Sequence, residues 1–341
     1  MLVAGLLLVP TGLGGAFFVS HLESAPLTGR TQLVFLNTTQ EMELGVMAAS
    51  LVYKAEKEHI LPRSAPETII VHDISAGLLK SLKQQIQGQG EDAARLRDRI
   101  TDMQWEVSVI DSDVVNAFVV PSGSIFVYTG LLKQVQTTGA LAFILGHEIS
   151  HALARHSVEK MGILCVGSFF VDFCAGFLGS SAHRYLQYML LPYLQALILD
   201  LPFSRRLETE ADVLGVQLMA NAGYDPQEAI EAWKRMEQGE EHGGGGRKAM
   251  EFVSTHPSHH TRIERLTALL PKARAMQQQA VRVKLQRGEK VPDSKQSISP
   301  SSSMRHGRTS KEVEAIRQRR REESAQTALR ASSLIPPPPP E

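Results

Sequence analysis

The chain has 341 residues, enough for one large domain or two with an ample hydrophobic core. Its 36 Lys and Arg balance 36 Asp and Glu, but residues 272–330 hold 15 of the basic residues against 6 acidic ones. That part therefore carries +9 and the remainder −9. The two cysteines, Cys165 and Cys174, would lie about 13 Å apart on a continuous helix, which excludes a disulfide between them.

The first 22 residues predict a membrane anchor. Residues 2–20 are apolar and nearly uncharged, and their length suits the hydrocarbon core of a bilayer. A cleaved signal peptide is the alternative, but basic residues do not precede the run and a small-residue cleavage site is not evident. No Arg-rich, Ser-rich transit peptide precedes it in this sequence.

Local patterns in chain order predict a mainly α protein with a small β-sheet, an α+β fold. Strands are expected at 32–36, 68–72, 105–110, 114–120 and 124–128. Helices are expected at 38–58, 76–87, 91–102, 138–157, 204–221, 225–237 and 259–283. Residues 26–285 would thus form one domain.

The strand at 114–120 has two interpretations. As an edge strand it would offer Asn116, Ala117 and Phe118 to an extended peptide, which could add itself to the sheet through main-chain hydrogen bonds. As half of an ordinary hairpin around the 121–123 turn it would only complete the core. The sequence leaves both open.

The helix at 138–157 carries the chemistry. His147-Glu148-Ile-Ser-His151 places two imidazoles one turn apart on one helix face. Two such nitrogens can bind one zinc ion, and Glu148 beside them can deprotonate a water that zinc has acidified. His156 would lie on the opposite side of a continuous helix and is not expected to bind metal.

Residues 161–203 are strongly apolar except for Asp172. They could form a helical hairpin that dips into a bilayer, or helices that cover the metal-binding helix. A lipid-exposed Asp172 would be costly, which favours a buried or membrane-apposed hairpin.

The helix at 204–221 offers a third zinc ligand. Glu208 and Asp212 share a face, so Glu208 could bind the metal and Asp212 could accept a hydrogen bond from a ligand imidazole. A solvated acidic face paired with Arg205 and Arg206 is the alternative. Glu210 points elsewhere on the helix and is expected at the surface.

Two features follow this helix. His256, in a stiff turn before Pro257, either begins the next helix or reaches the zinc. Residues 286–341 are rich in Ser, Gln, Lys and Arg and end in prolines, which predicts a disordered basic tail. Because aromatic residues do not interleave with its charges, nucleic-acid binding is not expected.

The chain from about residue 26 to 270 resembles the membrane-associated HExxH zinc metallopeptidases, which include the CAAX prenyl proteases and the bacterial heat-shock protease. The resemblance rests on five motifs, namely Asn116-Ala-Phe118, Gly130-Leu-Leu132, His147-Glu148-Ile-Ser-His151, Ser204-Arg-Arg-Leu-Glu208-Thr-Glu-Ala-Asp212 and Ser254-Thr-His256-Pro257 with Arg262. Pro26-Leu-Thr-Gly-Arg30 and the preceding apolar span are most similar to the stress peptidases of the mitochondrial inner membrane, which overlap with the m-AAA protease.

The resemblance implies a zincin-like endopeptidase with one Zn²⁺ per chain, bound by His147, His151 and Glu208, and with Glu148 as general base. It places Asp212 behind the ligands and Asn116 on the substrate edge. A separate hypothesis, from the rigid turn at Thr255-His256-Pro257, is that His256 gates the open zinc position or steadies the oxyanion, and Arg262 is grouped with these supporting residues. Expected partners are membrane or misfolded protein substrates and the lipid bilayer, and a homo-oligomer is compatible. A bacterial envelope or another organelle membrane is the alternative location. The alternative function is a non-catalytic membrane assembly or quality-control factor with a structural zinc.

Overall fold

The computed structural model describes residues 19–25, 27–86, 91–164, 202–242 and 260–298, and the single residues 17, 166, 252 and 256. The chain divides into two units, residues 1–299 and residues 300–341, and every described residue belongs to the first.

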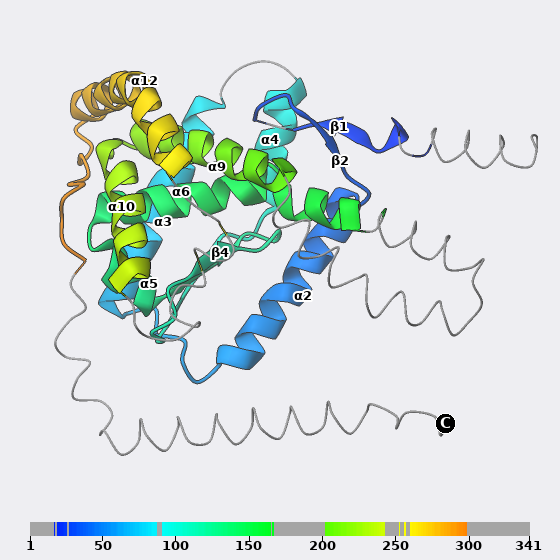
Figure 1. Cartoon of the computed structure of the whole chain (residues 1–341), viewed down its shortest axis with the longest axis horizontal. Helices are drawn as coiled ribbons and strands as arrows, with labels where there is room; N and C mark the ends of the chain where they lie inside the picture. Colours follow the sequence, from blue (N-terminus) through cyan, green and yellow to red (C-terminus); the bar gives the residue numbers. More distant parts are fainter. Residues whose placement is uncertain are drawn as a thin grey trace, which may run out of the picture. The chain divides into compact units, whose positions relative to one another are not determined.

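The described part is mainly helical with two small sheets (Figure 1). The helices are α2 (Thr38–Glu56), α3 (Pro66–Gln85), α4 (Glu91–Asp102), α5 (Thr129–Val135), α6 (Thr138–Leu153), α9 (Pro202–Asn221), α10 (Gln227–His242) and α12 (His260–Gln286). The strands are β1 (Leu22–Ser24), β2 (Thr31–Leu33), β3 (Glu106–Ile110), β4 (Ala117–Val119) and β5 (Ser124–Tyr128). The predicted α+β class is confirmed.

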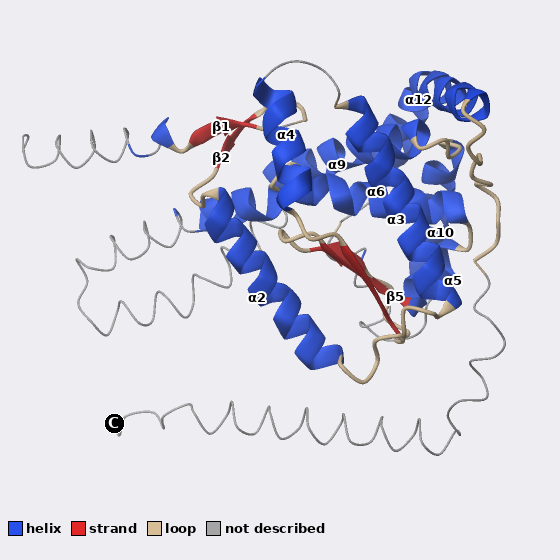
Figure 2. Ribbon diagram, turned by 180° about the vertical axis from the view of Figure 1, so that it is seen from behind, coloured by secondary structure: helices blue, strands red, loops and turns tan. Residues whose placement is uncertain are grey.

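The larger sheet has the order β3-β5-β4, with β3 parallel and β4 antiparallel to β5. Strand β5 is central, and alternate side chains enter two different cores. Phe126 packs with Tyr53 of α2 on one face, whereas Ile125 and Val127 join the main core with α6 on the other. Helix α2 thus covers one face of the sheet, as Figure 2 shows.

Helix α6 lies at the centre of the main core, and all of its 16 residues are buried. The Thr137 side chain accepts a hydrogen bond from the Ala140 amide and caps the helix. Helix α9 runs against α6, and its Gly215 packs directly on the backbone of Gly146 and His147. An added Cβ on Gly215 would lie 2.9 Å from the backbone nitrogen of His147, so only glycine permits α9 to approach α6 this closely.

Two helices, α3 and α6, differ in an instructive way from the sequence prediction. Residues 68–72 are not a strand, because they lie inside α3. Pro66 begins that helix, and burial of Val71, Ile74 and Leu78 at helical spacing outweighs the local β preference. The metal-binding helix ends at Leu153 rather than 157, because Arg155 adopts φ 63° before a new helical segment over residues 156–164.

The ordered chain also extends beyond the predicted domain end at 285. Residues 287–298 follow α12 and return to the start of α6, where Ser297 pairs with Thr137 and Ile298 is buried. The amides of Thr138 and Gly139 donate to carbonyls of Gln296 and Ser294. This segment therefore satisfies amides that the first turn of a helix leaves free.

Several predictions fall outside the described residues. They are the anchor over 1–22 apart from 17 and 19–22, the hairpin over 161–203 apart from its ends, and the tail from 299. Within the described part of the chain, no helix is both long enough and apolar enough to cross a bilayer.

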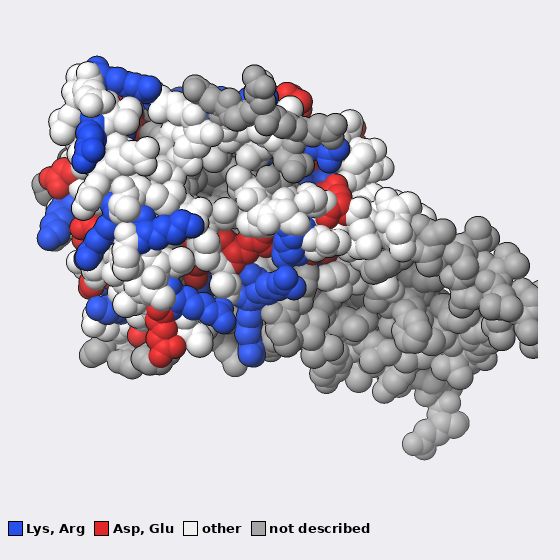
Figure 3. All heavy atoms as spheres, turned by 90° about the horizontal axis from the view of Figure 1, so that it is seen from above, with Lys and Arg blue, Asp and Glu red and all other residues white. Residues whose placement is uncertain are grey.

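The surface carries charges of both signs. Figure 3 shows Lys and Arg interspersed with Asp and Glu on the face seen from above. Exposed ion pairs such as Lys80–Glu289 and Lys133–Asp113 join elements distant in sequence. Pairs of this kind contribute little stability, so the packing of the helices around α6 carries most of it.

Candidate metal centre

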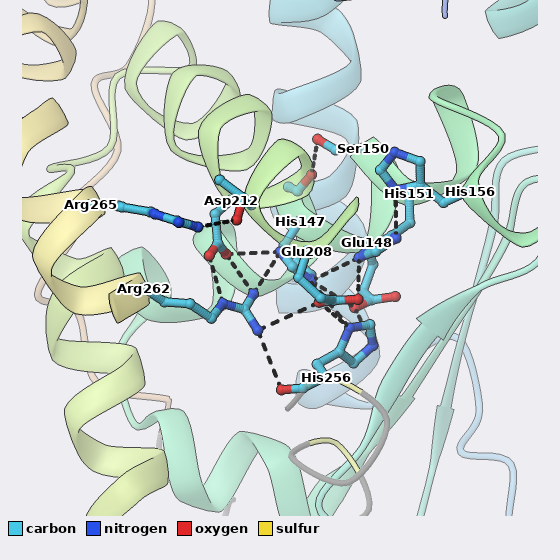
Figure 4. Close-up of polar contacts among 12 residues, drawn as sticks. His147, Glu148, Ser150, His151, His156, Glu208, Asp212, His256, Arg262 and Arg265 are labelled. Carbon is cyan, nitrogen blue, oxygen red and sulfur yellow. Dashed lines mark hydrogen bonds and ion pairs between the residues drawn. The ribbon is translucent and has the colours of Figure 1, made fainter. Parts of the chain in front are cut away.

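Three segments distant in sequence meet at one buried site (Figure 4). Helix α6 supplies His147, Glu148 and His151, and α9 supplies Glu208 and Asp212. His256 comes from the segment before α12. All six side chains are almost completely buried, with residue exposures between 0% and 9%.

Four of these residues form a group that could hold a metal ion: His147, His151, Glu208 and His256, whose ligand atoms lie within 4.8 Å of one another. The Nε2 atoms of His147 and His151 are 3.1 Å apart. Glu208 Oε2 lies 3.4 Å from His147 Nε2 and 2.8 Å from His256 Nδ1. The structure thus brings Glu208 to the two imidazoles, which the local sequence left undecided.

The donors fit a zinc ion. Among the described residues, Glu208 Oε1 is buried without a hydrogen-bond partner, although a buried polar atom normally has one. His151 Nε2 lies 3.6 Å from that oxygen. A cation between imidazoles and a carboxylate would satisfy these atoms together, and this donor set is typical of zinc. His147, His151 and Glu208 would hold it.

Asp212 holds His147 from behind. Its Oδ1 lies 3.1 Å from His147 Nδ1, so Nε2 faces the metal group. Arg262 donates from Nε to Oδ2 at 2.6 Å and from Nη2 to Oδ1 at 2.7 Å, and its guanidinium lies 3.9 Å above the Trp233 ring. Burial alone would raise the pKa of Asp212, but Arg262 outweighs it and keeps that pKa low. The carboxylate is therefore ionised and fixed.

Glu148 lies beside the metal group rather than within it. Its Oε1 is 3.9 Å from His147 Nε2 and 3.3 Å from His256 Nε2, and it has no hydrogen-bond partner in the described part. Burial raises the pKa of Glu148 to about 7 against the attraction of His256. A carboxyl group with such a pKa can both take and give a proton near neutral pH.

His256 occupies the remaining side of the group. Its amide donates to Phe252 O, and the Phe252 amide donates to Val115 O just before β4. Arg262 Nη1 donates to the His256 carbonyl at 3.3 Å. The segment carrying His256 is thus tied both to the sheet and to the arginine that holds Asp212.

Strand β4 lies at the edge of its sheet, as one interpretation of the sequence required. Asn116 and Ala117 are buried, whereas Phe118 is half-buried and packs with Phe126 on the α2 side. The Asn116 carbonyl accepts from the Tyr128 amide, which secures the start of the strand against β5.

Sequence reasoning missed two residues. Glu210 is not a surface residue, because it accepts hydrogen bonds from Thr28 and Arg30 and lies 3.3 Å from His156 Nε2. His156 is outside the metal group, but it contacts His151 rather than facing away from it. The Pro26-Leu-Thr-Gly-Arg30 motif, which supplies the Thr28 and Arg30 partners of Glu210, is a signal in the sequence that could indicate its role.

Known proteins similar to this chain are metallopeptidases, as the donor set of the site indicates. Residues 80–270 match the family model "Peptidase family M48". The chain belongs to peptidase family M48. A mitochondrial metalloendopeptidase OMA1 of Schizosaccharomyces pombe is 34% identical, with 76% of this chain and 70% of that protein aligned. The mitochondrial metalloendopeptidase OMA1 of Homo sapiens is 32% identical over 75% of this chain, but this chain spans only 47% of the human protein.

A more distant relative is bacterial. The beta-barrel assembly-enhancing protease of Escherichia coli is 28% identical over 35% of this chain and 25% of its own length. Together the family and its mitochondrial members confirm the predictions of a zinc metalloendopeptidase and of a mitochondrial location.

Proposed function

We propose that this M48 peptidase cleaves membrane or misfolded proteins at the mitochondrial inner membrane, as part of protein quality control under stress. The mitochondrial relatives support the compartment, and the apolar residues 2–20 support a membrane anchor. The observation that carries the catalytic assignment is the buried Glu148 carboxylate beside His147, His151 and Glu208, whose Oε1 has no hydrogen bond among the described residues.

Each residue of the site has a separate role in peptide-bond hydrolysis. Zinc, when bound, supplies a Lewis acid that acidifies water and polarises a carbonyl group. Glu148 takes a proton from the attacking water and returns it to the leaving amine. Asp212 and Arg262 keep His147 in the orientation that turns Nε2 to the metal group. Burial excludes bulk water from all of these groups.

A single substitution tests the role of Glu148. Glu148→Gln should retain zinc at one ion per chain but reduce casein hydrolysis about 10²–10⁴-fold, because general-base catalysis is lost. Zinc is measured by metal analysis of the purified chain, and hydrolysis with and without chelator. The exposed Glu43→Gln serves as the control. Cleavage of casein by Glu148→Gln at the parental rate would refute the assignment.

The substrate is proposed to bind as an added strand along the outer edge of β4, beside Asn116, Ala117 and Phe118. Strand β4 has β5 on one side and lies at the sheet edge. The hydrogen bond from Phe252 to Val115 brings the His256 segment to the start of the same strand. An extended peptide paired with β4 would then run past the metal group. Main-chain pairing needs no particular sequence, so this mode of binding would accept many substrates.

His256 is proposed to gate the site. Its Nδ1 lies 2.8 Å from Glu208 Oε2 and 3.4 Å from His147 Nε2, so His256 could supply a fourth ligand to a zinc ion held by the other three residues. His256→Ala should lower zinc affinity and raise the hydrolysis rate at saturating zinc. A lower rate would instead assign His256 to stabilising the oxyanion, and unchanged affinity and rate would exclude both roles.

The alternative function follows from the same four donors. If His256 remained a permanent fourth ligand, the chain would be a non-catalytic assembly or quality-control factor with a structural zinc. Cobalt substitution distinguishes the two, because an exchangeable water changes the spectrum on adding a competing anion. Absence of any such change, together with no casein hydrolysis, would favour the structural role.

A further inference from the structure

The outer nitrogen of His151 has an unusual neighbour. His151 Nδ1 lies 2.8 Å from Nδ1 of His156, a second imidazole. A dashed line joins the two rings in Figure 4. His147, by contrast, directs its Nδ1 to a carboxylate. Both His151 and His156 are buried.

The geometry determines which nitrogen carries each proton. His151 Nε2 faces His147 Nε2 and Glu208, so a metal ligand there needs its lone pair on Nε2 and its proton on Nδ1. That proton must be donated to His156 Nδ1, which must then be an acceptor. The proton of neutral His156 is therefore on Nε2, which lies 3.3 Å from Glu210 Oε2.

The far end of this chain is a fixed anion. Arg30 Nε donates to Glu210 Oε2 at 2.7 Å, and the Thr28 hydroxyl donates to the other oxygen. Burial would raise the pKa of Glu210, but its hydrogen bonds from His156, Thr28 and Arg30 lower it to about 2.

The helix break explains how His156 reaches His151. Arg155 at φ 63° ends the α6 segment and turns the chain, so His156 does not lie on the far side of a continuous helix. The Arg155 side chain donates to Glu41, Glu23 and the Leu36 carbonyl, with distances of 2.6 to 2.8 Å. These bonds hold a conformation that a residue other than glycine rarely adopts.

We propose that His156 is a positioning residue that fixes the metal-binding tautomer of His151, and that Glu210, held by Thr28 and Arg30, fixes His156 in turn. This role rests on the proposed zinc site. It connects the turn between β1 and β2 to a metal ligand through three side chains. Arg30 also bonds Glu159 through both Nη atoms, which joins the turn to the segment that carries His156.

Zinc affinity of the full-length chain in detergent tests the role by substitution. His156→Leu should weaken zinc binding about 10–100-fold in chelator competition, as loss of a group that orients a ligand does. His156→Asn, whose amide oxygen can take the place of Nδ1 as acceptor, should restore most of the loss. His72→Asn, at an exposed histidine of α3, is the control and should bind as the parent does. Equal affinity of His156→Leu and the parent overturns the proposal.

A second measurement uses the unsubstituted chain and is independent of how the variants fold. Nitrogen-15 spectra of the zinc-loaded protein should show His151 protonated on Nδ1 and His156 protonated on Nε2 only. A proton on His156 Nδ1, in either a neutral or a doubly protonated ring, overturns the proposal. A parent chain that binds no zinc contradicts the proposed function itself, whereas a chain that binds zinc with the other tautomer contradicts only the role of His156.

Discussion

The two zinc-ligand histidines of α6 are supported in different ways. His147 contacts the carboxylate of Asp212 directly, and Arg262 of α12 grips that carboxylate with two hydrogen bonds. His151 reaches the carboxylate of Glu210 only through His156, and the arginine behind it comes from the N-terminal turn. Both carboxylates belong to α9.

The difference follows from where each histidine lies on α6. His147 lies in the middle of the helix, where Gly215 lets α9 approach closely and a short Asp side chain suffices. His151 lies near the end of α6, and the gap to α9 is bridged by an imidazole that the helix break delivers. The first support is deeply buried, whereas the Arg30 side chain of the second is 12% exposed and lines a surface hollow with Arg205, Arg206 and Arg265.

The largest difference between the two supports should appear on removing the carboxylates. Asp212→Ala removes both carboxylate hydrogen bonds of the buried Arg262 and leaves it the longer, 3.5 Å ion pair with Glu208, which should cost about 3–5 kcal/mol of unfolding free energy. Zinc affinity should fall about 100-fold. Glu210→Ala should cost less in both measurements, since Arg30 keeps Glu159 as a partner. Chemical denaturation of the zinc-free chain and chelator competition provide the numbers. A greater loss in Glu210→Ala would reverse the ranking.

Pushing α9 away from α6 should disturb both supports together. In Gly215→Ala the new Cβ would lie 2.9 Å from the backbone nitrogen of His147 and 3.0 Å from its Cα. Overpacking of this kind should cost about 1–3 kcal/mol of stability and weaken zinc binding. Gly77→Ala is the matched control, because its Cβ meets nothing within 4 Å and it lies inside α3. That control should gain about 0.5–1 kcal/mol. If Gly215→Ala had the stability and zinc affinity of the parent, the α6–α9 distance would not limit either property.

The smallest expected effect is at the outer end of the His151 support. Arg30→Gln should reduce zinc affinity by less than about 10-fold, the lower bound for a group that orients a ligand directly. The exposed Arg63, which pairs with Glu106 at the surface, provides the control Arg63→Gln. Chelator competition at low ionic strength measures both. Identical zinc affinities of Arg30→Gln and Arg63→Gln would show that the turn between β1 and β2 does not affect the metal group.

The sequence predicts the local half of this site well. The spacing of His147 and His151 depends only on helix geometry, and the helix itself follows from its apolar run and Thr137 cap. Glu208 depends on the packing of α9 on α6, so local chemistry could not decide between a ligand and a solvated acid. The family resemblance was needed to prefer the ligand.

The missed half depends on tertiary contacts. Neither glycine nor proline marks the end of α6 at Leu153 in the sequence. Hydrogen bonds from Arg155 to Glu41 and Glu23, far earlier in the chain, stabilise the break instead. With the helix continued to 157, His156 points away and Glu210 has no partner. The strand expected at 68–72 was wrong for the same kind of reason, since burial of α3 decides its conformation.

The return of residues 294–298 to the first turn of α6 affects how the enzyme is made. The amides that open the catalytic helix find their acceptors some 155 positions later, at Ser294 and Gln296. On the ribosome, the helix bearing both zinc histidines emerges long before these acceptors, α9 or Arg262. A nascent chain therefore carries an incomplete peptidase, and the capacity to cut proteins arises only once almost the whole domain has been synthesised.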